Sequence, residues 1–257
     1  MNARLLLLAL AIGVPVRAQT PLQIRINQPR PLEAALGQLE KRLGIPINYE
    51  DPRFACSSEI EDVTEKVQSP AQKAANPNVR IIVPKKGQLR LDSVLPATPQ
   101  IADALSLVTK LRLQYEAKGY AGRFTVKLVR SILTVEPIKA RAASCDWTTV
   151  TPVMETRISI PAGVRNASDT LSAILQKVAD KVGVKIGTAS IPVLAFVNRK
   201  NITLSANDEP ANTVLAKLLE QLSPGPVLYS WHLFYDPGLK YYMIGIAAVQ
   251  LLRPSVL

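Results

Sequence analysis

Two segments of the chain carry the same amphipathic pattern, and this internal similarity constrains the fold more than any other feature. Residues 32–47, LEAALGQLEKRLGIPI, align without a gap with residues 171–186, LSAILQKVADKVGVKI. In both segments apolar side chains recur at i, i+3, i+4, i+7 and i+11, which forms one stripe of a helix. Gly44 or Gly183 follows each stripe, and glycine suits the left-handed conformation that ends helices.

The elements predicted around these helices follow one order in both halves of the chain. Alternating apolar residues indicate strands, and turn residues separate the elements. In chain order the first half has a strand (22–26), a helix (32–43), a short strand (45–49), a hairpin (79–94), a second helix (101–117) and a closing strand pair (124–136). The second half has the same series at 156–160, 171–182, 184–187, 193–204, 211–222 and 229–249. Chance similarity of two amphipathic helices is the alternative, but it does not explain the shared order.

These patterns predict an α+β fold with two tandem β-α-β-α-β-β-like repeats. Too few helices separate the strands for a doubly wound sheet, so we expect each repeat to pack two helices on one face of a small mixed sheet. Each half is about 100 residues long, which is enough for a modest core. The predicted organisation is a signal peptide at 1–18, a first repeat at 19–138 with a loop insertion at 53–78, a linker at 139–153 and a second repeat at 154–257.

The packing pattern resembles that of a known family. The segment from Leu32 to Gly44-Ile45 follows L-x-x-A-L-x-x-L-x-x-x-x-G-[IV], and a second helix in each half has Ala104-Leu105 or Val214-Leu215 near its start. In these features the chain resembles the short N-terminal domain of secretins and TonB receptors. The resemblance implies a periplasmic docking or signalling module of Gram-negative bacteria. It rests on packing residues and transfers no catalytic residue.

The first 18 residues, MNARLLLLALAIGVPVRA, have the three parts of a cleavable signal peptide. Arg4 supplies a positive charge, residues 5–14 are apolar, and Val16-Arg17-Ala18 places small residues where a signal peptidase acts. The apolar stretch is shorter than the roughly 20 residues that span a bilayer. An uncleaved anchor or a buried strand is the alternative. We expect a mature chain that begins at Gln19, lacks a transmembrane segment and is periplasmic or secreted.

Cys56 and Cys145 are the only cysteines. In an exported protein two cysteines suggest one disulfide, which here would close a loop of about 90 residues. Two free thiols or a reactive site are the alternatives. Neither cysteine has the spacing of a metal site.

The chain is basic, and its net charge falls from +11 to +9 once Arg4 and Arg17 are removed with the signal peptide. Positive charge attracts nucleic acid, lipopolysaccharide and acidic lipid. The basic residues are scattered singly or in pairs such as Lys85-Lys86 and Arg199-Lys200, without interleaved aromatics. Solubility alone therefore explains the charge better, and nucleic acid is not the expected partner.

Two groups of residues are candidates for chemistry. His232 is the only histidine, and alternation places it opposite Trp231 and Leu233, so we expect it to face solvent or a neighbouring strand. Six acidic residues are candidates for acid–base catalysis or calcium binding, although a solvated acidic surface is favoured because their spacing fits no calcium loop. They are Glu50, Asp51, Glu59, Glu61, Asp62 and Glu65. No phosphate loop, nucleophile elbow or HExxH motif occurs, so we assign no catalytic residue, cofactor or metal.

The C-terminal strand pair contains the densest group of aromatic residues. One face should close the second core, while the other could expose tyrosines that bind a partner or its strand edge. Core packing and ordinary sheet surface are the favoured alternative. The candidate interaction surface consists of Tyr229, Trp231, Tyr235, Tyr241 and Tyr242.

Together these features predict an exported binding or adapter protein without enzymatic activity, whose partner is another envelope protein. The chain ends at Leu257 without room for a barrel and carries the insertion at 53–78, and both departures from the resembled family favour a free-standing adapter. A small secreted hydrolase that uses carboxylates in 50–65, or a binder of anionic envelope surfaces, is the alternative.

Overall fold

The computed structural model describes residues 20–189, 200–223, 225 and 227–250, so the predicted signal peptide and the predicted strand at 193–197 lie outside the described residues. The first half contains β1 (Thr20–Gln28), α1 (Pro31–Leu43), β2 (Ile47–Glu50), β5 (Gly87–Leu95), α4 (Ile101–Ala117), β6 (Arg123–Val129) and β7 (Ile132–Arg141). The second half contains β9 (Arg157–Asn166), α5 (Ala167–Val182), β10 (Ile186–Thr188), β11 (Asn201–Pro210), α7 (Ala211–Leu222), β12 (Val227–Asp236) and β13 (Tyr241–Gln250). The predicted α+β class is confirmed.

Shorter elements connect these parts. Between β2 and β5 lie η1 (Ser57–Glu59), β3 (Ile60–Asp62), α2 (Thr64–Val67), α3 (Pro70–Ala75) and β4 (Ile82–Pro84). Between the halves lie β8 (Trp147–Thr149) and η2 (Val153–Glu155). The segment 139–153, which we expected to act as a linker, therefore continues β7 and returns as β8 along it.

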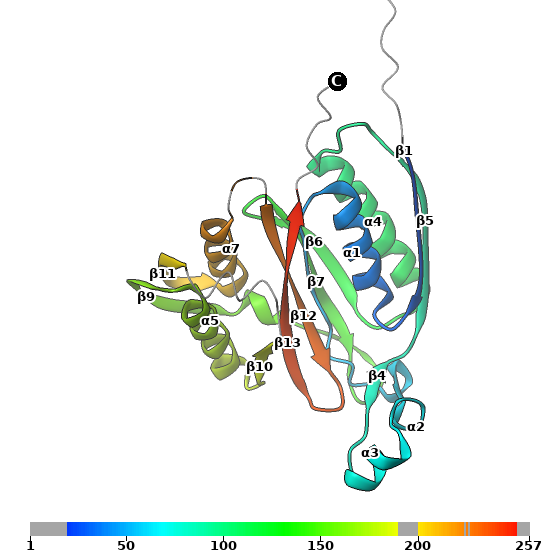
Figure 1. The fold of residues 1–257 in the computed structure, drawn as a ribbon. Coiled ribbons are helices and arrows are strands. Elements are labelled where there is room, and N and C mark those ends of the chain that lie inside the picture. Colours follow the sequence, from blue (N-terminus) through cyan, green and yellow to red (C-terminus); the bar gives the residue numbers. More distant parts are fainter. Residues whose placement is uncertain (1–19, 190–199, 224, 226, 251–257) are drawn as a thin grey trace, which may run out of the picture.

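The strands of both halves meet in one central sheet with the order β10-β13-β12-β2-β7-β6, and β8 pairs with β7. Strand β12 pairs in parallel with β2 through His232↔Tyr49 and Leu233↔Glu50. Helices α1 and α4 lie on one side of this sheet, and α5 and α7 lie on the other (Figure 1). Two antiparallel ribbons, β1 with β5 and β9 with β11, cover the outer faces of the two helix pairs.

The helical stripes identified in the sequence form the centres of two cores. All five positions of the first stripe, from Leu32 to Leu43, are buried between the β1–β5 ribbon and the central sheet. The second stripe packs in the same way on β9, β11 and β12, with Val182 only partly buried. Gly44 and Gly183 end their helices with φ of 62° and 64°, which confirms the predicted left-handed caps.

The hairpin predicted over 79–94 does not form. Strand β4 pairs with β3, and β5 pairs along its whole length with β1. The physical reason is that Leu89 and Leu91 alternate in phase with Leu22 and Ile24, and the joined ribbon buries all four side chains against α1 and α4. In the second half β11 likewise pairs with β9, which precedes it by a whole helix.

Cys56 and Cys145 form a disulfide with a Cα–Cα distance of 4.9 Å. It ties the start of η1 to the turn between β7 and β8, and so holds the 53–62 segment against the central sheet. A disulfide is compatible with a periplasmic or extracellular compartment. In the described part of the chain, no helix is both long enough and apolar enough to pass through a bilayer.

Replacing both cysteines, Cys56→Ala with Cys145→Ala, should lower the free energy of unfolding by about 4 kcal/mol, because the bridge closes a long loop in the unfolded chain. Urea unfolding of the oxidised wild type and the double variant measures this difference. The reduced wild type is the control and should resemble the variant. Equal stability of all three would show that the bridge does not stabilise the fold.

Candidate functional site

The six acidic residues between 50 and 65 do not form the solvated surface that we expected. Glu50, Asp51 and Glu59 are buried, whereas Glu61, Asp62 and Glu65 are partly or fully exposed. The expectation was wrong for the buried three because β2 is an inner strand of the central sheet and η1 is held inward by the disulfide. The three buried carboxylates have different surroundings.

Glu50 joins the two halves. Its carboxylate oxygens accept hydrogen bonds from the backbone N–H groups of Val153, at 2.6 Å, and Met154, at 3.0 Å. Burial raises the pKa of Glu50 to about 8, although these two donors oppose the rise. The carboxyl group is thus a structural acceptor for the backbone of η2.

Asp51 is bound by three groups from three elements. Its Oδ2 lies 2.6 Å from Nε of Arg30 and accepts the backbone N–H of Tyr235 at 3.0 Å, while Tyr49 donates its hydroxyl to Oδ1 at 3.0 Å. Arg30 also donates to the carbonyl of Tyr235 at 2.6 Å. Asp51 is therefore fully occupied in holding the beginning of α1 and the end of β12 together.

A further polar cluster connects β6 and β7 with the second half. Lys127 forms ion pairs with Glu136, at 2.6 Å, and with Glu155. Asn212 at the start of α7 donates to the same two carboxylates, at 2.9 Å and 2.6 Å. All four side chains belong to the junction between the halves, and each satisfies another.

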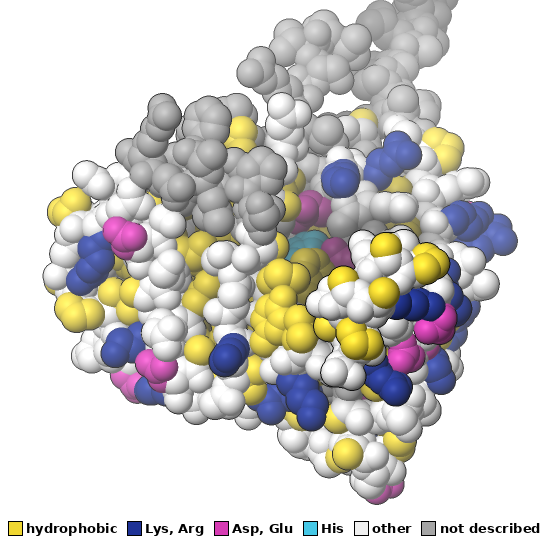
Figure 2. Space-filling view, turned by 60° about the horizontal axis from the view of Figure 1, so that its bottom comes forward, with side chains coloured by type: hydrophobic (Ala, Val, Ile, Leu, Met, Phe, Trp, Pro, Cys, Tyr) yellow, Lys and Arg dark blue, Asp and Glu magenta, His cyan; other side chains and the backbone are white. Residues whose placement is uncertain are grey.

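His232 is buried beneath α1 and does not face solvent as a free base. Its Nδ1 lies 2.9 Å from Oε1 of Glu33, and its Nε2 lies 3.2 Å from the carbonyl oxygen of Ile47. Burial alone would lower the pKa of His232, but Glu33 and Glu40 outweigh it and raise the pKa. In the space-filling view the histidine is visible only at the bottom of a hollow (Figure 2). It serves as a contact between the halves.

The five aromatic residues of the candidate interaction surface do not lie together on an exposed face. Tyr229, Trp231 and Tyr242 are buried in the second core, and Tyr235 and Tyr241 are partly exposed. The prediction assumed that β12 and β13 would leave one aromatic face open and one edge unpaired. In the structure β12 lies between β13 and β2, so both of its edges are occupied.

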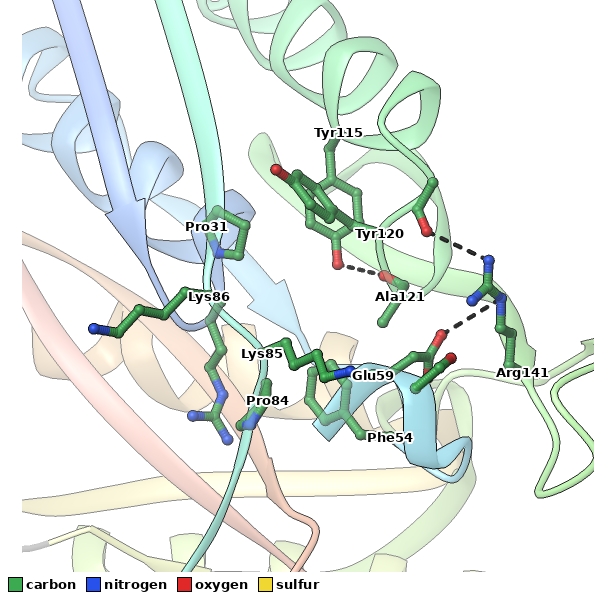
Figure 3. Close-up of a pocket in the computed structure, with 13 residues that line it drawn as sticks. Pro31, Phe54, Glu59, Pro84, Lys85, Lys86, Tyr115, Tyr120, Ala121 and Arg141 are labelled. Atoms are coloured by element: carbon green, nitrogen blue, oxygen red, sulfur yellow. Dashed lines mark hydrogen bonds and ion pairs between the residues drawn. The ribbon is translucent and has the colours of Figure 1, made fainter. Parts of the chain in front are cut away.

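The structure does form a pocket that the sequence did not indicate, which we name the Glu59 pocket. It lies between the end of α4, η1 and the segment that joins β4 to β5 (Figure 3). Its volume is about 170 Å³. Its walls include Pro31, Phe54, Glu59, Tyr115, Tyr120 and Arg141, and Lys85 and Lys86 also line it.

Close backbone packing shapes this pocket. A Cβ atom at Gly87 would lie 2.8 Å from both Pro31 and Tyr120, so only glycine lets β5 approach these rings. Tyr120 in turn accepts the backbone N–H of Gln88 at 2.7 Å. The rings are therefore held in place by the β5 backbone.

Glu59 is the polar centre of the pocket. Its side chain is 4% exposed, and neither carboxylate oxygen has a hydrogen-bond partner among the described residues. Nε of Arg141 lies 3.7 Å from Oε1, which is an ion-pair distance beyond a normal hydrogen bond. Burial raises the pKa of Glu59 to about 7, although Arg141 and Arg123 lower it.

Arg141 is fixed beside Glu59 by an aromatic stack. The indole ring of Trp147 contacts two guanidinium groups, with its centroid 4.1 Å from Cζ of Arg123 and 4.8 Å from Cζ of Arg141. Such cation–π contacts favour a fixed guanidinium position. The disulfide lies on the same side of the molecule, because Cys56 precedes η1 and Cys145 precedes β8.

A second hollowed surface lies between α1 and β13, and we name it the β13 groove. Phe234, Met243, Gly245 and Ala247 face it from the sheet, on the same side as His232. Two hollows of about 420 Å³ and 470 Å³ occupy its ends, the first beside Glu33 of α1 and the second beside Glu40. On β13, Met243 and Gly245 are partly exposed and Ala247 is exposed. The sheet side of the groove is mostly apolar, and its hollows are also lined by charged residues such as Glu33, Glu40 and Lys41.

Comparisons with protein-family models, with curated proteins and with solved structures found no match. Among the described residues, no group of three or more His, Cys, Asp and Glu side chains could hold a metal ion.

Glu50→Ala should lower the free energy of unfolding by about 2–4 kcal/mol, because two buried N–H groups lose their acceptor. The matched control is Glu65→Ala, which removes an exposed carboxylate that pairs only with Lys73 and should change stability by less than about 0.5 kcal/mol. Urea unfolding measures both variants. Equal effects would show that the contact between Glu50 and η2 does not stabilise the junction.

Glu59→Gln should reduce the loss of stability that accompanies rising pH. Because the folded-state pKa of Glu59 is raised to about 7, protonation favours the folded chain. Wild-type stability should then decrease as pH rises from the ordinary glutamate pKa of about 4.3 through about 7. Unfolding midpoints at about pH 5 and about pH 8 measure the decrease. If the Glu59→Gln variant lost as much stability over this pH range as the wild type, the raised pKa of Glu59 would be contradicted.

Proposed function

We propose that this chain is an exported binding protein, an adapter that docks a segment of an envelope protein in the β13 groove. The observation that carries the proposal is the pair of hollows beside α1, where partly exposed apolar side chains of β12 and β13 lie next to charged side chains, since exposed apolar surface with a polar rim commonly marks an interaction site. The disulfide supports an oxidising compartment. The signal peptide at 1–18 is part of the proposal and comes from the sequence alone.

The chemistry of the groove defines the segment that would fit it. The Phe234 ring packs over Gly245, so the room for an apolar side chain of the partner lies beside the small side chain of Ala247. At one end Asp236 lines the hollow with Glu33, and Asp236 forms no ion pair with any described residue. We therefore infer that the partner segment has apolar side chains flanked by a basic residue.

The alternatives receive less support from the same observations. A hydrolase that uses carboxylates in 50–65 would need these groups to converge, but Glu50 and Asp51 are occupied by structural partners. A binder of anionic surfaces would need a concentrated basic face, whereas many of the basic residues form ion pairs with carboxylates of the chain, such as Arg30, Lys127 and Arg130.

A photo-crosslinking residue in place of Met243 should capture one envelope protein when the full chain is expressed in its native host. Adding Ala247→Asp should reduce that product by at least about tenfold, because a charge would be desolvated in the groove. The matched controls are the crosslinker at exposed Val164 on β9, and Val164→Asp.

The crosslinked peptide should contain apolar residues next to Lys or Arg. The proposal would be contradicted if the crosslinker at Val164 gave the same product, or if Ala247→Asp left the yield of the product from position 243 unchanged. If the chain bound lipopolysaccharide, and if this binding was lost at high salt but unchanged by Ala247→Asp, the anionic-surface alternative would be supported instead.

A further inference from the structure

The Glu59 pocket has the size of a small-ligand site. An engineered apolar cavity of about 150 Å³ accommodates a benzene molecule, and the Glu59 pocket measures about 170 Å³. The rings of Tyr115 and Tyr120 lie on one side of the pocket and the ring of Phe54 lies on the opposite side, and Pro31 also lines the pocket (Figure 3). One aromatic ring or one branched aliphatic group is thus the apolar part that fits.

The carboxylate of Glu59 calls for a ligand that donates hydrogen bonds. Buried polar groups in proteins are nearly always hydrogen-bonded, and an unmet carboxylate is costly. Both oxygens of Glu59 lack such a partner in the described part of the chain, while the side chain lies at the pocket wall. Arg141 balances the charge at 3.7 Å but leaves the hydrogen-bonding positions of the carboxylate open. An ammonium group would fill these positions with charge-assisted bonds.

A lysine of the pocket calls for an anionic group on the same ligand. Lys85 and Lys86 are exposed and form no ion pair with a described residue, but only Lys85 extends toward Glu59, whereas the Lys86 side chain extends away from it (Figure 3). The position of Lys85 is held by the backbone, because Lys85 donates its N–H to the carbonyl of Glu59 at 2.8 Å. The pocket thus presents one buried acceptor and one free cation, Lys85, beside apolar rings.

From this arrangement we infer that the Glu59 pocket binds a free amino acid with an apolar side chain. The ammonium group bonds Glu59, the carboxylate faces Lys85, and the side chain packs on Tyr115 and Phe54. This site is separate from the β13 groove, since only Arg30 lines both, and its guanidinium is already bonded to Asp51.

Titration calorimetry with the purified full chain tests the inference through three matched probes. L-Phenylalanine carries both charged groups, 3-phenylpropanoate lacks the ammonium group, and 2-phenylethylamine lacks the carboxylate. L-Phenylalanine or L-leucine should bind with a Kd below about 1 mM, and each truncated probe should bind at least about tenfold more weakly. Absence of binding by both amino acids, or equal binding of the three phenyl compounds, would overturn the inference.

Variants assign the two ends of the ligand. Glu59→Gln should weaken the binding of L-phenylalanine at least about tenfold but should not weaken the binding of 3-phenylpropanoate. Lys85→Gln should weaken the binding of L-phenylalanine and leave the binding of 2-phenylethylamine unchanged. The matched control, Glu61→Gln, changes a carboxylate outside the pocket and should leave binding unchanged.

Circular dichroism and the melting temperature without ligand establish that each variant is folded. If Glu59→Gln is folded and binds L-phenylalanine as the wild type does, the inference fails. Ala247→Asp should bind the amino acid normally, so failure of the groove proposal and failure of this one are distinguishable.

Discussion

The junction between β2 and β12 is the constraint on which the rest of the structure depends. The two strands pair in parallel and make one sheet from the strands of both halves. The polar side chains of β2 are buried there and bind the opposite half: Asn48 accepts the backbone N–H of Trp231 at 3.0 Å, and Glu50 accepts two from η2. Because a buried polar group without a hydrogen-bond partner is costly, other alignments of β2 against β12 are disfavoured.

This junction also decides which surfaces remain open. It places the two helix pairs on opposite faces of the sheet, so α1 covers β2 and His232 while the outer part of β13 extends beyond it (Figure 1). The Glu59 pocket has a different origin. It forms where the disulfide holds η1 against the end of α4, and there the packing leaves a carboxylate without a hydrogen bond.

The sequence predicted local elements well and the site poorly. Helical stripes and glycine caps depend on neighbours within one helix, so the periodicity that starts at Leu32 located α1 correctly. Strand partners are not local in the sequence. The hairpin expected over 79–94 was wrong because β5 pairs with β1, which lies on the other side of α1 in the chain. The pairing of Cys56 with Cys145 followed from there being only two cysteines. The Glu59 pocket had no local signal, since its residues come from segments far apart in the chain.

The sequence by itself determined the α+β class, the four main helices and the strands that close each half, because hydrophobic periodicity is written along the chain. Only the tertiary structure decided that Tyr229, Trp231 and Tyr242 are core and that Glu50 and Asp51 are buried. Burial depends on which strand lies beside which, and an alternating strand looks the same in the sequence whether it lies at an edge or in the middle of a sheet. The parallel contact of β2 with β12 settled that question for this protein.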